Sequence, residues 1–312
     1  MDGDRLNQFQ KIREQDAALI FTQFDSALTV LDIAPIRNSM SNSNYIVATN
    51  AGKYLLKLYS NSTDVVETMA YSYLRDKINV PDLLYYDNSK RISPYVFTIL
   101  EYIDGNTLLE NIRTGGGFST DIIREIGRMS AVLHSKTYSN DALFDKLPDA
   151  NIQIPNTHER ILILLSGRAG SHLQPRTANQ LRDFIETRTD LFDQIEQQSV
   201  FCHGDLNYSN ILIKDKKVYF IDFEFAYAGS RYHDIGHFFR RKDDDVQSLI
   251  GSNVYDAFAD GYKTQGTMLP DNWLTLAQLC DIAPMLCLLD RENPPAEWVS
   301  DIEHDILHAI CK

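Results

Sequence analysis

One short segment, residues 202–224, constrains this chain more than any other. It places Asp205 in a Gly-Asp turn after an apolar stretch, Asn210 five residues later, and Asp222 twelve residues beyond that. Apolar stretches that read as short strands follow Asn210 and precede Asp222. Phosphoryl transfer needs such a trio, because one carboxylate faces the acceptor hydroxyl while an amide oxygen and a second carboxylate hold magnesium. The segment therefore predicts a site that uses ATP and Mg2+, with Asp205 as catalytic residue and Asn210 and Asp222 as metal ligands.

Each member of the trio also has a plainer interpretation. An aspartate in a tight turn can bond its own backbone, as Asp205 would. An asparagine in the position of Asn210 can simply begin a strand. For Asp222 the plainer interpretation is costly, because an unpaired carboxylate buried at the end of an apolar strand costs on the order of several kcal/mol. The combined spacing favours the chemical interpretation for all three residues.

A second candidate cluster lies in the first third of the chain. Lys57 stands in the mainly apolar stretch 54–59, and Glu67 follows ten residues later in a segment that reads as a helix over 63–77. A lysine on a strand can bond nucleotide phosphates when a glutamate on the next helix holds it in place. An exposed lysine and a surface glutamate are the alternative. Together with the later trio, the pattern favours a nucleotide-binding pair.

Two further stretches are candidates for nucleotide binding. The Ser/Asn-rich stretch 38–45 lies between expected strands and should cover the phosphates through Ser41 and Asn42, although such clusters commonly mark ordinary turns. It contains neither GxGxxG nor GxxxxGK[ST]. Backbone groups of Glu101 and Ile103 should read the adenine edge, because an extended connector exposes them without needing a particular side chain.

The expected elements are rich in strands up to residue 102 and mainly helical after it, which indicates an α+β fold. The segment 103–106 ends the β-rich part and is the expected boundary between 1–102 and 103–312. Residues 137–157 contain two prolines and little periodicity, so we expect a loop there. Periodicity predicts helices over 4–24, 63–77, 122–134, 176–195, 233–242, 245–264, 271–289 and 297–310, and strands over 28–36, 44–49, 53–59, 81–86, 95–102 and within 199–224.

Four motifs follow one another within residues 201–236. They are His203-Gly204-Asp205, Asn210, Ile221-Asp222-Phe223-Glu224 and His233-Asp234-Ile235-Gly236. With the order of expected elements, they resemble the aminoglycoside phosphotransferase and choline kinase superfamily, a group of small-molecule kinases. The resemblance extends over nearly the whole chain. It implies a bilobal protein-kinase-like fold, in which a β-rich N-lobe binds the nucleotide and a mostly helical C-lobe holds the catalytic loop, metal site and substrate pocket.

The resemblance also implies supporting roles for two residues. The family's histidine at the position of His203 braces the catalytic loop, and its aspartate at the position of Asp234 supports that loop. Asp234 could instead cap the helix expected over 233–242, or do both. The sequence departs from the family's usual pattern at Asn207-Tyr208-Ser209, which leaves the subfamily open but keeps the chemical residues.

Composition excludes several other classes of function. The net charge of −13 disfavours nucleic acid as a partner, because phosphate backbones recruit lysine and arginine. No run of 18 apolar residues predicts a membrane span, and the start Met1-Asp2-Gly3-Asp4 lacks the features of a signal peptide. Four widely spaced cysteines without a CxxC pair suggest neither a zinc site nor a disulfide framework. We therefore expect a cytoplasmic protein with no membrane partner.

The acceptor is expected to be a small hydroxylated molecule. Residues 201–312 hold 18 acidic against 10 basic residues, which could attract a cationic acceptor or could simply confer solubility. An aminoglycoside-like antibiotic is the first expectation, which would imply antibiotic resistance, and a metabolite such as choline, homoserine, methylthioribose or an amino sugar is the second. A nucleotide binder without catalysis is the alternative class, disfavoured because the whole trio is present. Candidate acceptor contacts are Asp256, Asp260, Asp271, Asp281, Asp290, Glu292, Glu297, Tyr255, Tyr262, Trp273 and Trp298.

Overall fold

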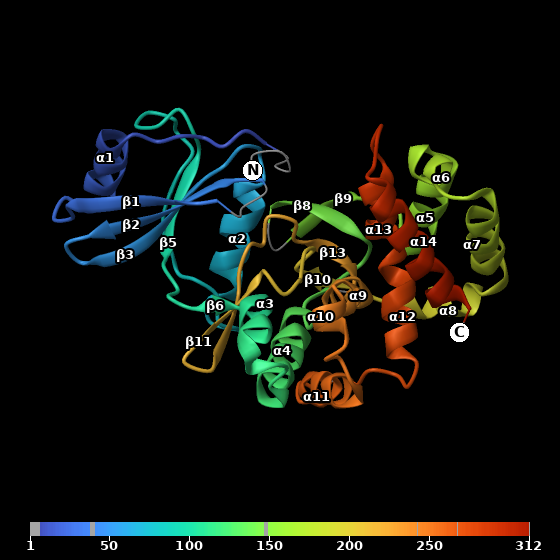
Figure 1. The fold of residues 1–312 in the computed structure, drawn as a ribbon. Coiled ribbons are helices and arrows are strands. Elements are labelled where there is room, and N and C mark those ends of the chain that lie inside the picture. Colours follow the sequence, from blue (N-terminus) through green and yellow to red (C-terminus); the bar gives the residue numbers. More distant parts are fainter. Residues whose placement is uncertain (1–6, 38–40, 147–148, 242, 267, 312) are drawn as a thin grey trace.

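The computed structural model of this protein describes residues 7–37, 41–146, 149–241, 243–266 and 268–311. A five-stranded antiparallel sheet forms one end of the molecule, and helices with two smaller sheets form the rest (Figure 1). The expected α+β class is therefore confirmed, with a β-rich N-terminal part and a mainly helical C-terminal part as in a protein-kinase-like fold. The division at residue 102 stays a prediction.

The N-terminal sheet has the strand order β1-β2-β3-β5-β4. Its strands are β1 (Val30–Ile36), β2 (Ser43–Thr49), β3 (Gly52–Leu58), β4 (Leu83–Asp87) and β5 (Phe97–Glu101). Alternate residues of β2 are buried because one face of the sheet packs against Ile20 and Phe21 of helix α1 (Glu14–Phe24). Helix α2 (Asp64–Leu74) lies between the sheet and the C-terminal part (Figure 1). A hairpin turn joins β2 to β3, with Thr49 opposite Gly52.

The predicted helix over 4–24 is wrong in its first half. The helix α1 begins at Glu14, and residues 7–13 have no helical turn, while 1–6 lie outside the described residues. The reason is a set of bonds to the sheet. The Gln10 N–H donates to Ser43 Oγ over 2.8 Å, and the Tyr45 hydroxyl donates to the Gln10 carbonyl over 2.8 Å. These partners engage backbone groups that a helix would have to bond internally.

The C-terminal part contains two sheets beside the candidate site. One has the order β7-β10-β13-β8-β9 and the other the order β12-β11-β6. The described residues of 137–157 therefore include three strands, β7, β8 and β9, where a loop was expected: β8 pairs with β13, and buried Ala142 and Phe144 flank exposed Leu143. The strands are β6 (Asn106–Thr107), β7 (Thr137–Tyr138), β8 (Ala142–Lys146), β9 (Asp149–Gln153), β10 (Ser199–Cys202), β11 (Ile211–Lys214), β12 (Lys217–Phe220) and β13 (Tyr227–Ser230).

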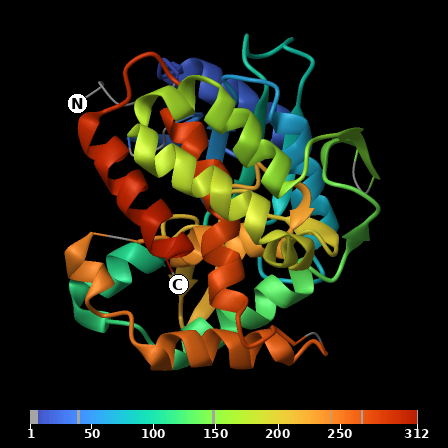
Figure 2. The same ribbon diagram turned by 90° about the vertical axis from the view of Figure 1, so that its right-hand side faces the viewer.

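Helices enclose these sheets and build the end of the molecule remote from the first sheet, where α5 to α8 lie beside α14 (Figures 1 and 2). They are α3 (Leu108–Asn111), the π-helical turn η1 (Ile112–Gly116), α4 (Thr120–Leu133), α5 (Thr157–Ser166), α6 (Arg168–His172), α7 (Pro175–Thr187), α8 (Thr189–Ile195), α9 (Arg231–Phe239), α10 (Asp244–Gln247), α11 (Ser252–Lys263), α12 (Trp273–Cys280), α13 (Ile282–Leu289) and α14 (Ala296–Ile310).

Three helices expected to be continuous are each divided in the structure. The segment 245–264 forms α10 and α11, with residues 248–251 outside both helices. The segment 271–289 forms α12 and α13, because Pro284 has no N–H for the Cys280 carbonyl and its ring crowds that turn. The segment 176–195 forms α7 and α8, and the backbone of Arg188 between them leaves the helical region. In the described parts of the chain, no helix combines the length and the apolar character that a membrane crossing requires.

Candidate active site

The loop from β10 to β11 presents Asp205, the predicted catalytic residue. Gly204 takes a φ of +84°, a conformation that favours glycine. A Cβ at this position would lie 2.0 Å from the Phe225 carbonyl oxygen, so the loop also needs glycine for space. Gly204 therefore lets the loop pass against the segment that follows Asp222 and turn the Asp205 side chain into the site.

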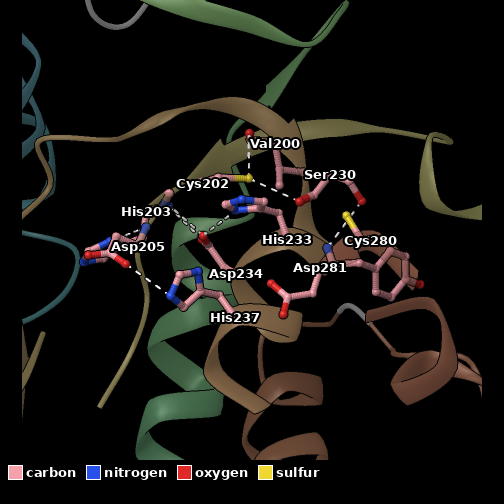
Figure 3. Close-up of polar contacts among 12 residues, drawn as sticks. Val200, Cys202, His203, Asp205, Ser230, His233, Asp234, His237, Cys280 and Asp281 are labelled. Atoms are coloured by element: carbon pink, nitrogen blue, oxygen red, sulfur yellow. Dashed lines mark hydrogen bonds and ion pairs between the residues drawn. The ribbon is translucent and has the colours of Figure 1, made fainter. Parts of the chain in front are cut away.

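Three side chains donate hydrogen bonds to the Asp205 carboxylate. Asn207 Nδ2 lies 2.9 Å from Oδ1, and Asn210 Nδ2 lies 2.8 Å from Oδ2. His237 Nε2, from α9, lies 3.1 Å from Oδ1 (Figure 3). Burial alone would raise the pKa of Asp205, but the hydrogen bond from His237, with a smaller contribution from Asn207, lowers it below its usual range. The carboxylate is therefore ionised at neutral pH and can accept a proton.

Asp234 braces the backbone of this loop. Its Oδ2 accepts the His203 N–H at 2.7 Å (Figure 3). Its Oδ1 accepts the Gly204 N–H at 3.0 Å, and His134 Nε2 lies 3.1 Å from Oδ2. Burial opposes ionisation, yet the hydrogen bonds and charge interactions with His134 and His233 hold the pKa of Asp234 far below its usual range. The alternative role as a helix cap is wrong, because α9 begins at Arg231 and Ser230 is its cap. The brace that the resemblance implied matches this geometry.

His203 is fully buried and connects the loop after β10 to the residue that follows β12. Its Nε2 donates to the Ile221 carbonyl over 2.9 Å, and its Nδ1 accepts the Asp205 N–H over 3.3 Å. Both ring nitrogens are thus engaged by backbone groups on either side of the site. This arrangement fits the bracing role expected for His203 rather than acid–base chemistry.

Asn210 and Asp222 lie at adjacent strand ends. Asn210 directly precedes β11, Asp222 follows β12, and the Ile221 N–H donates to the Asn210 carbonyl over 3.0 Å. The side-chain nitrogen of Asn210 donates to Asp205, so its amide oxygen is the atom left to bind a cation. Asp222 has a φ of +67°, and its N–H donates to the Tyr71 hydroxyl over 3.0 Å. An amide oxygen and a carboxylate are hard ligands that fit Mg2+ completed by phosphates and water.

The predicted pair of Lys57 and Glu67 exists and is buried. Lys57 Nζ lies 2.8 Å from Glu67 Oε1 and 2.7 Å from Oε2, and Glu67 Oε2 also accepts the Tyr59 hydroxyl at 2.7 Å. Lys57 Nζ also lies 2.7 Å from Asp222 Oδ1. Burial would lower the pKa of Lys57, but Asp222 and Glu67 raise it well above its usual value, so the ammonium stays charged. The two candidate clusters of the sequence thus meet at this cation.

The Ser/Asn-rich stretch reaches Glu224 through Asn42, one of its two residues expected to cover the phosphates; that role stays a prediction. Asn42 Nδ2 donates to Glu224 Oε2 over 2.6 Å, and Asn42 Oδ1 accepts the Ser60 N–H at 3.0 Å. Thr63 Oγ1 also donates to Glu224 Oε2, over 2.9 Å. Asn42 therefore connects the N-terminal part to the C-terminal part through Glu224, and Ser41, the residue before it, is also buried. Residues 38–40 of the stretch lie outside the described residues.

Glu101 and Ile103 lie where the connector was expected. Glu101 ends β5 opposite Tyr54 of β3, and its N–H donates to the Asp82 carbonyl over 2.9 Å. The side chain of Ile103 is buried, which leaves its backbone as the part that could bind a base. Their role in adenine binding stays a prediction.

Several residues expected around an acceptor have other partners. Asp281 is buried and accepts two bonds from Arg240, and Tyr262 is buried with its hydroxyl 2.9 Å from His134 Nδ1. The placement of Asp281 and Tyr262 in an acceptor pocket is therefore wrong. Asp260 pairs with Lys263 at the surface. The remaining acidic side chains of that set stay candidates.

His237 was missed by the sequence reasoning. It lies three residues after Asp234, so one turn of α9 places both side chains toward the catalytic loop. The spacing of an aspartate and a histidine on one helix face was the available signal. It does not by itself say which loop the helix will meet.

Comparisons with known proteins agree with this geometry. A model of a phosphotransferase enzyme family matches residues 32–297, although no curated protein sequence matches the chain. Among solved structures, the aminoglycoside phosphotransferase APH(4)-Ia has a TM-score of 0.69 at 11% identity, over 96% of this chain and 99% of that one. Macrolide 2'-phosphotransferase MphH from Brachybacterium faecium has a TM-score of 0.64 at 15% identity, over 93% of this chain and 97% of that one. Choline kinase from Cryptosporidium parvum Iowa II has a TM-score of 0.60 at 17% identity, over 91% of this chain and 89% of that one.

At these identities the structural matches establish the fold alone. The family model extends over most of the chain and includes both candidate clusters, so it confirms the resemblance read from the motifs. The chain therefore belongs to the phosphotransferase enzyme family.

Proposed function

We propose that this enzyme moves the γ-phosphate of ATP, with Mg2+, to a hydroxyl of a small acceptor molecule. The observation that carries the proposal is the meeting of two separately recognised clusters. Lys57, held by Glu67, contacts Asp222, while Asn210 on the neighbouring strand donates to Asp205. The phosphate-binding cation thus contacts one proposed metal ligand, Asp222, and the other, Asn210, contacts the proposed base. A solved spectinomycin phosphotransferase of the same fold, crystallised with ADP, supports the nucleotide.

Each of these residues has a defined task in the proposed transfer. Lys57 binds the phosphates of ATP. Glu67, itself bonded by the Tyr59 hydroxyl, holds the ammonium of Lys57 in place. Asn210 and Asp222 would hold Mg2+, which supplies charge neutralisation on the transferring group when bound. Asp205 orients the acceptor hydroxyl and takes its proton as the oxygen attacks phosphorus in line with the departing ADP. Most of the acceleration comes from positioning and electrostatics, so no nucleophilic side chain is required.

For the acceptor we propose a cationic hydroxylated compound of aminoglycoside type. The support is the acidic balance of residues 201–312 and the structural likeness to APH(4)-Ia. A metabolite kinase is the second candidate, supported by the likeness to choline kinase. A non-catalytic nucleotide binder is disfavoured because Asp205, Asn210 and Asp222 are all present.

The test is release of ADP, measured by a coupled assay with Mg-ATP across aminoglycosides, macrolides, choline, homoserine and amino sugars. Asp205→Asn serves as the blank, because it keeps the size of the side chain and removes the base. ADP release that depends on an acceptor in the wild type and is absent in the variant would support the proposal and name the acceptor class. Absence of ATP binding in a thermal-shift assay would overturn it.

A further inference from the structure

His237 contacts the candidate base directly, although it lies far from it in sequence. It projects from α9 toward the catalytic loop, and its Nε2 lies 3.1 Å from Asp205 Oδ1 (Figure 3). The ring is largely buried, with its side chain 15% exposed. None of the roles described so far for the trio or for the Asp234 brace uses this imidazole.

The surroundings of the ring determine which nitrogen carries its hydrogen. Arg240 Nη2 lies 3.4 Å from His237 Nδ1, and a guanidinium can only donate. Arg240 is itself fixed by Asp281, whose two carboxylate oxygens each lie 2.7 Å from its nitrogens. Nδ1 therefore accepts, and the hydrogen of the neutral ring lies on Nε2, where it points at Asp205.

Burial and the charge of Arg240 keep the ring neutral. Among the described residues, the charged and titratable groups that face it include His233 of α9, Arg240 directly after α9, Asp281 between α12 and α13, and Asp205 of the loop. Burial, and then the charge of Arg240, lower the pKa of His237 below its usual value despite the two carboxylates. A neutral donor orients Asp205 without the full charge of an imidazolium, which would make the carboxylate a weaker base.

We propose that His237 is a positioning residue that fixes the Asp205 carboxylate through its Nε2–H, so that Oδ2 is the oxygen that receives the acceptor proton. Oδ1 already accepts from His237 and Asn207, whereas Oδ2 accepts from Asn210. A carboxylate oxygen has two lone pairs, so among the described residues these bonds leave one position on Oδ2 for the acceptor hydroxyl. The inference rests on the proposed function and assigns its proton transfer to one atom.

The chemical step is then balanced at named atoms. The acceptor O–H proton passes to Asp205 Oδ2, and the acceptor oxygen forms the new bond to the γ-phosphorus. The bond from that phosphorus to the bridging oxygen breaks, and ADP leaves with the electron pair. Without the bond from His237, the carboxylate could rotate and present the wrong oxygen for part of the time.

Two variants of His237 test the proposal. His237→Leu removes the donor and puts an apolar side chain in its place, whereas His237→Gln offers an amide N–H close to the position of Nε2. For Leu we expect kcat to fall about ten- to hundredfold, as for loss of one hydrogen bond to a charged group. The KM for ATP should stay within about twofold, since His237 does not touch the nucleotide-binding cluster. Gln should regain most of the loss.

A matched control separates positioning from general loss of packing. His172, on α6, donates from Nε2 to the Arg291 carbonyl over 3.0 Å, away from the site. His172→Leu also removes a partly buried histidine bond and should leave kcat unchanged. A His237→Leu enzyme with the kcat of the wild type would overturn the inference. A His237→Gln enzyme no better than His237→Leu would overturn it as well.

Two further outcomes are distinguishable. If the wild type releases no ADP with any acceptor, both the proposed function and the inference are wrong. If the wild type is active and His237→Leu has the same kcat, the inference alone is wrong. If His237→Leu does not fold, NMR of 15N-histidine-labelled wild type decides. We expect His237 to be neutral with its hydrogen on Nε2. A neutral ring with its hydrogen on Nδ1 would overturn the proposal.

Discussion

Lys57 Nζ lies 2.7 Å from Asp222 Oδ1, so a cation of the N-terminal sheet is paired with a carboxylate that follows β12. The side chain of Lys57 is 4% exposed and that of Glu67 is fully buried, which makes this an internal ion cluster. Removing one member of such a cluster is more costly than removing one member of a surface ion pair, because it leaves a buried charge without a partner.

Lys57→Met should therefore affect binding and stability together. We expect weaker ATP binding, because the phosphates lose their cation, and a loss of about 3–5 kcal/mol in the free energy of unfolding, because Glu67 stays buried without its partner. Urea denaturation and ATP titration measure the two effects. Lys53→Met, on the exposed part of the same strand, is the control. Adding Glu67→Gln should restore stability but not binding, and recovery of both would contradict the role of Lys57.

Asp205→Asn should separate chemistry from nucleotide binding. The carboxamide cannot take the acceptor proton, so turnover should fall at least about a hundredfold. ATP affinity should persist because Lys57, Glu67 and Asp222 are unchanged. Asp215→Asn, in the turn between β11 and β12, gives a matched carboxylate-to-amide control. Single-turnover ADP formation is the measurement, and an Asp205→Asn enzyme with full turnover would exclude Asp205 as the base.

Asp234→Asn should weaken the fold in a way that depends on pH. Folding lowers the pKa of Asp234, so its contribution is complete above the unfolded-state value of about 3.9 and is lost as pH falls through the folded value. We expect the variant to be about 3–5 kcal/mol less stable at pH 7, as for one partner removed from a buried charged network. Urea unfolding should give a constant difference from pH 7 to about 5 and a shrinking one below about 4. A difference independent of pH down to 3 would contradict the assignment.

Gly204→Ala should disturb the loop that carries Asp205. The new Cβ would lie 2.0 Å from the Phe225 carbonyl oxygen, so either the loop or the segment after Asp222 must move. We expect a lower melting temperature and a loss of turnover of more than about tenfold, since small misplacements are costly in catalysis. Gly52→Ala is the control, because its φ is also positive but no atom lies within 4 Å of the added Cβ. Equal effects of the two changes would show that backbone conformation, rather than the contact with Phe225, matters.

The sequence was most informative where neighbouring residues determine the structure. Asn210 and Asp222 stand at strand ends because apolar stretches of known length adjoin them, and Lys57 meets Glu67 because a strand and the next helix bring them together. These relationships depend on spacing along short segments. They could be predicted without any knowledge of distant contacts.

Two of the expectations that failed depend on partners from remote segments. Residues 7–13 are not helical because Ser43 and Tyr45 bond the backbone at Gln10. Asp234 is a brace rather than a cap because the loop at 203–204 presents two N–H groups to it. In both cases the local pattern was correct about propensity, and tertiary hydrogen bonds prevailed over it.

The left-handed backbone of Asp222 restricts which residues could ever replace it. Glycine, asparagine and aspartate tolerate a φ of +67°, and among them aspartate alone carries a charge. Glutamate, the ordinary conservative exchange, keeps the charge but belongs to the residues that resist this conformation. Substitution at this position is therefore expected to lead first to uncharged side chains, so a descendant of this enzyme would lose the proposed metal ligand while keeping the shape of the loop.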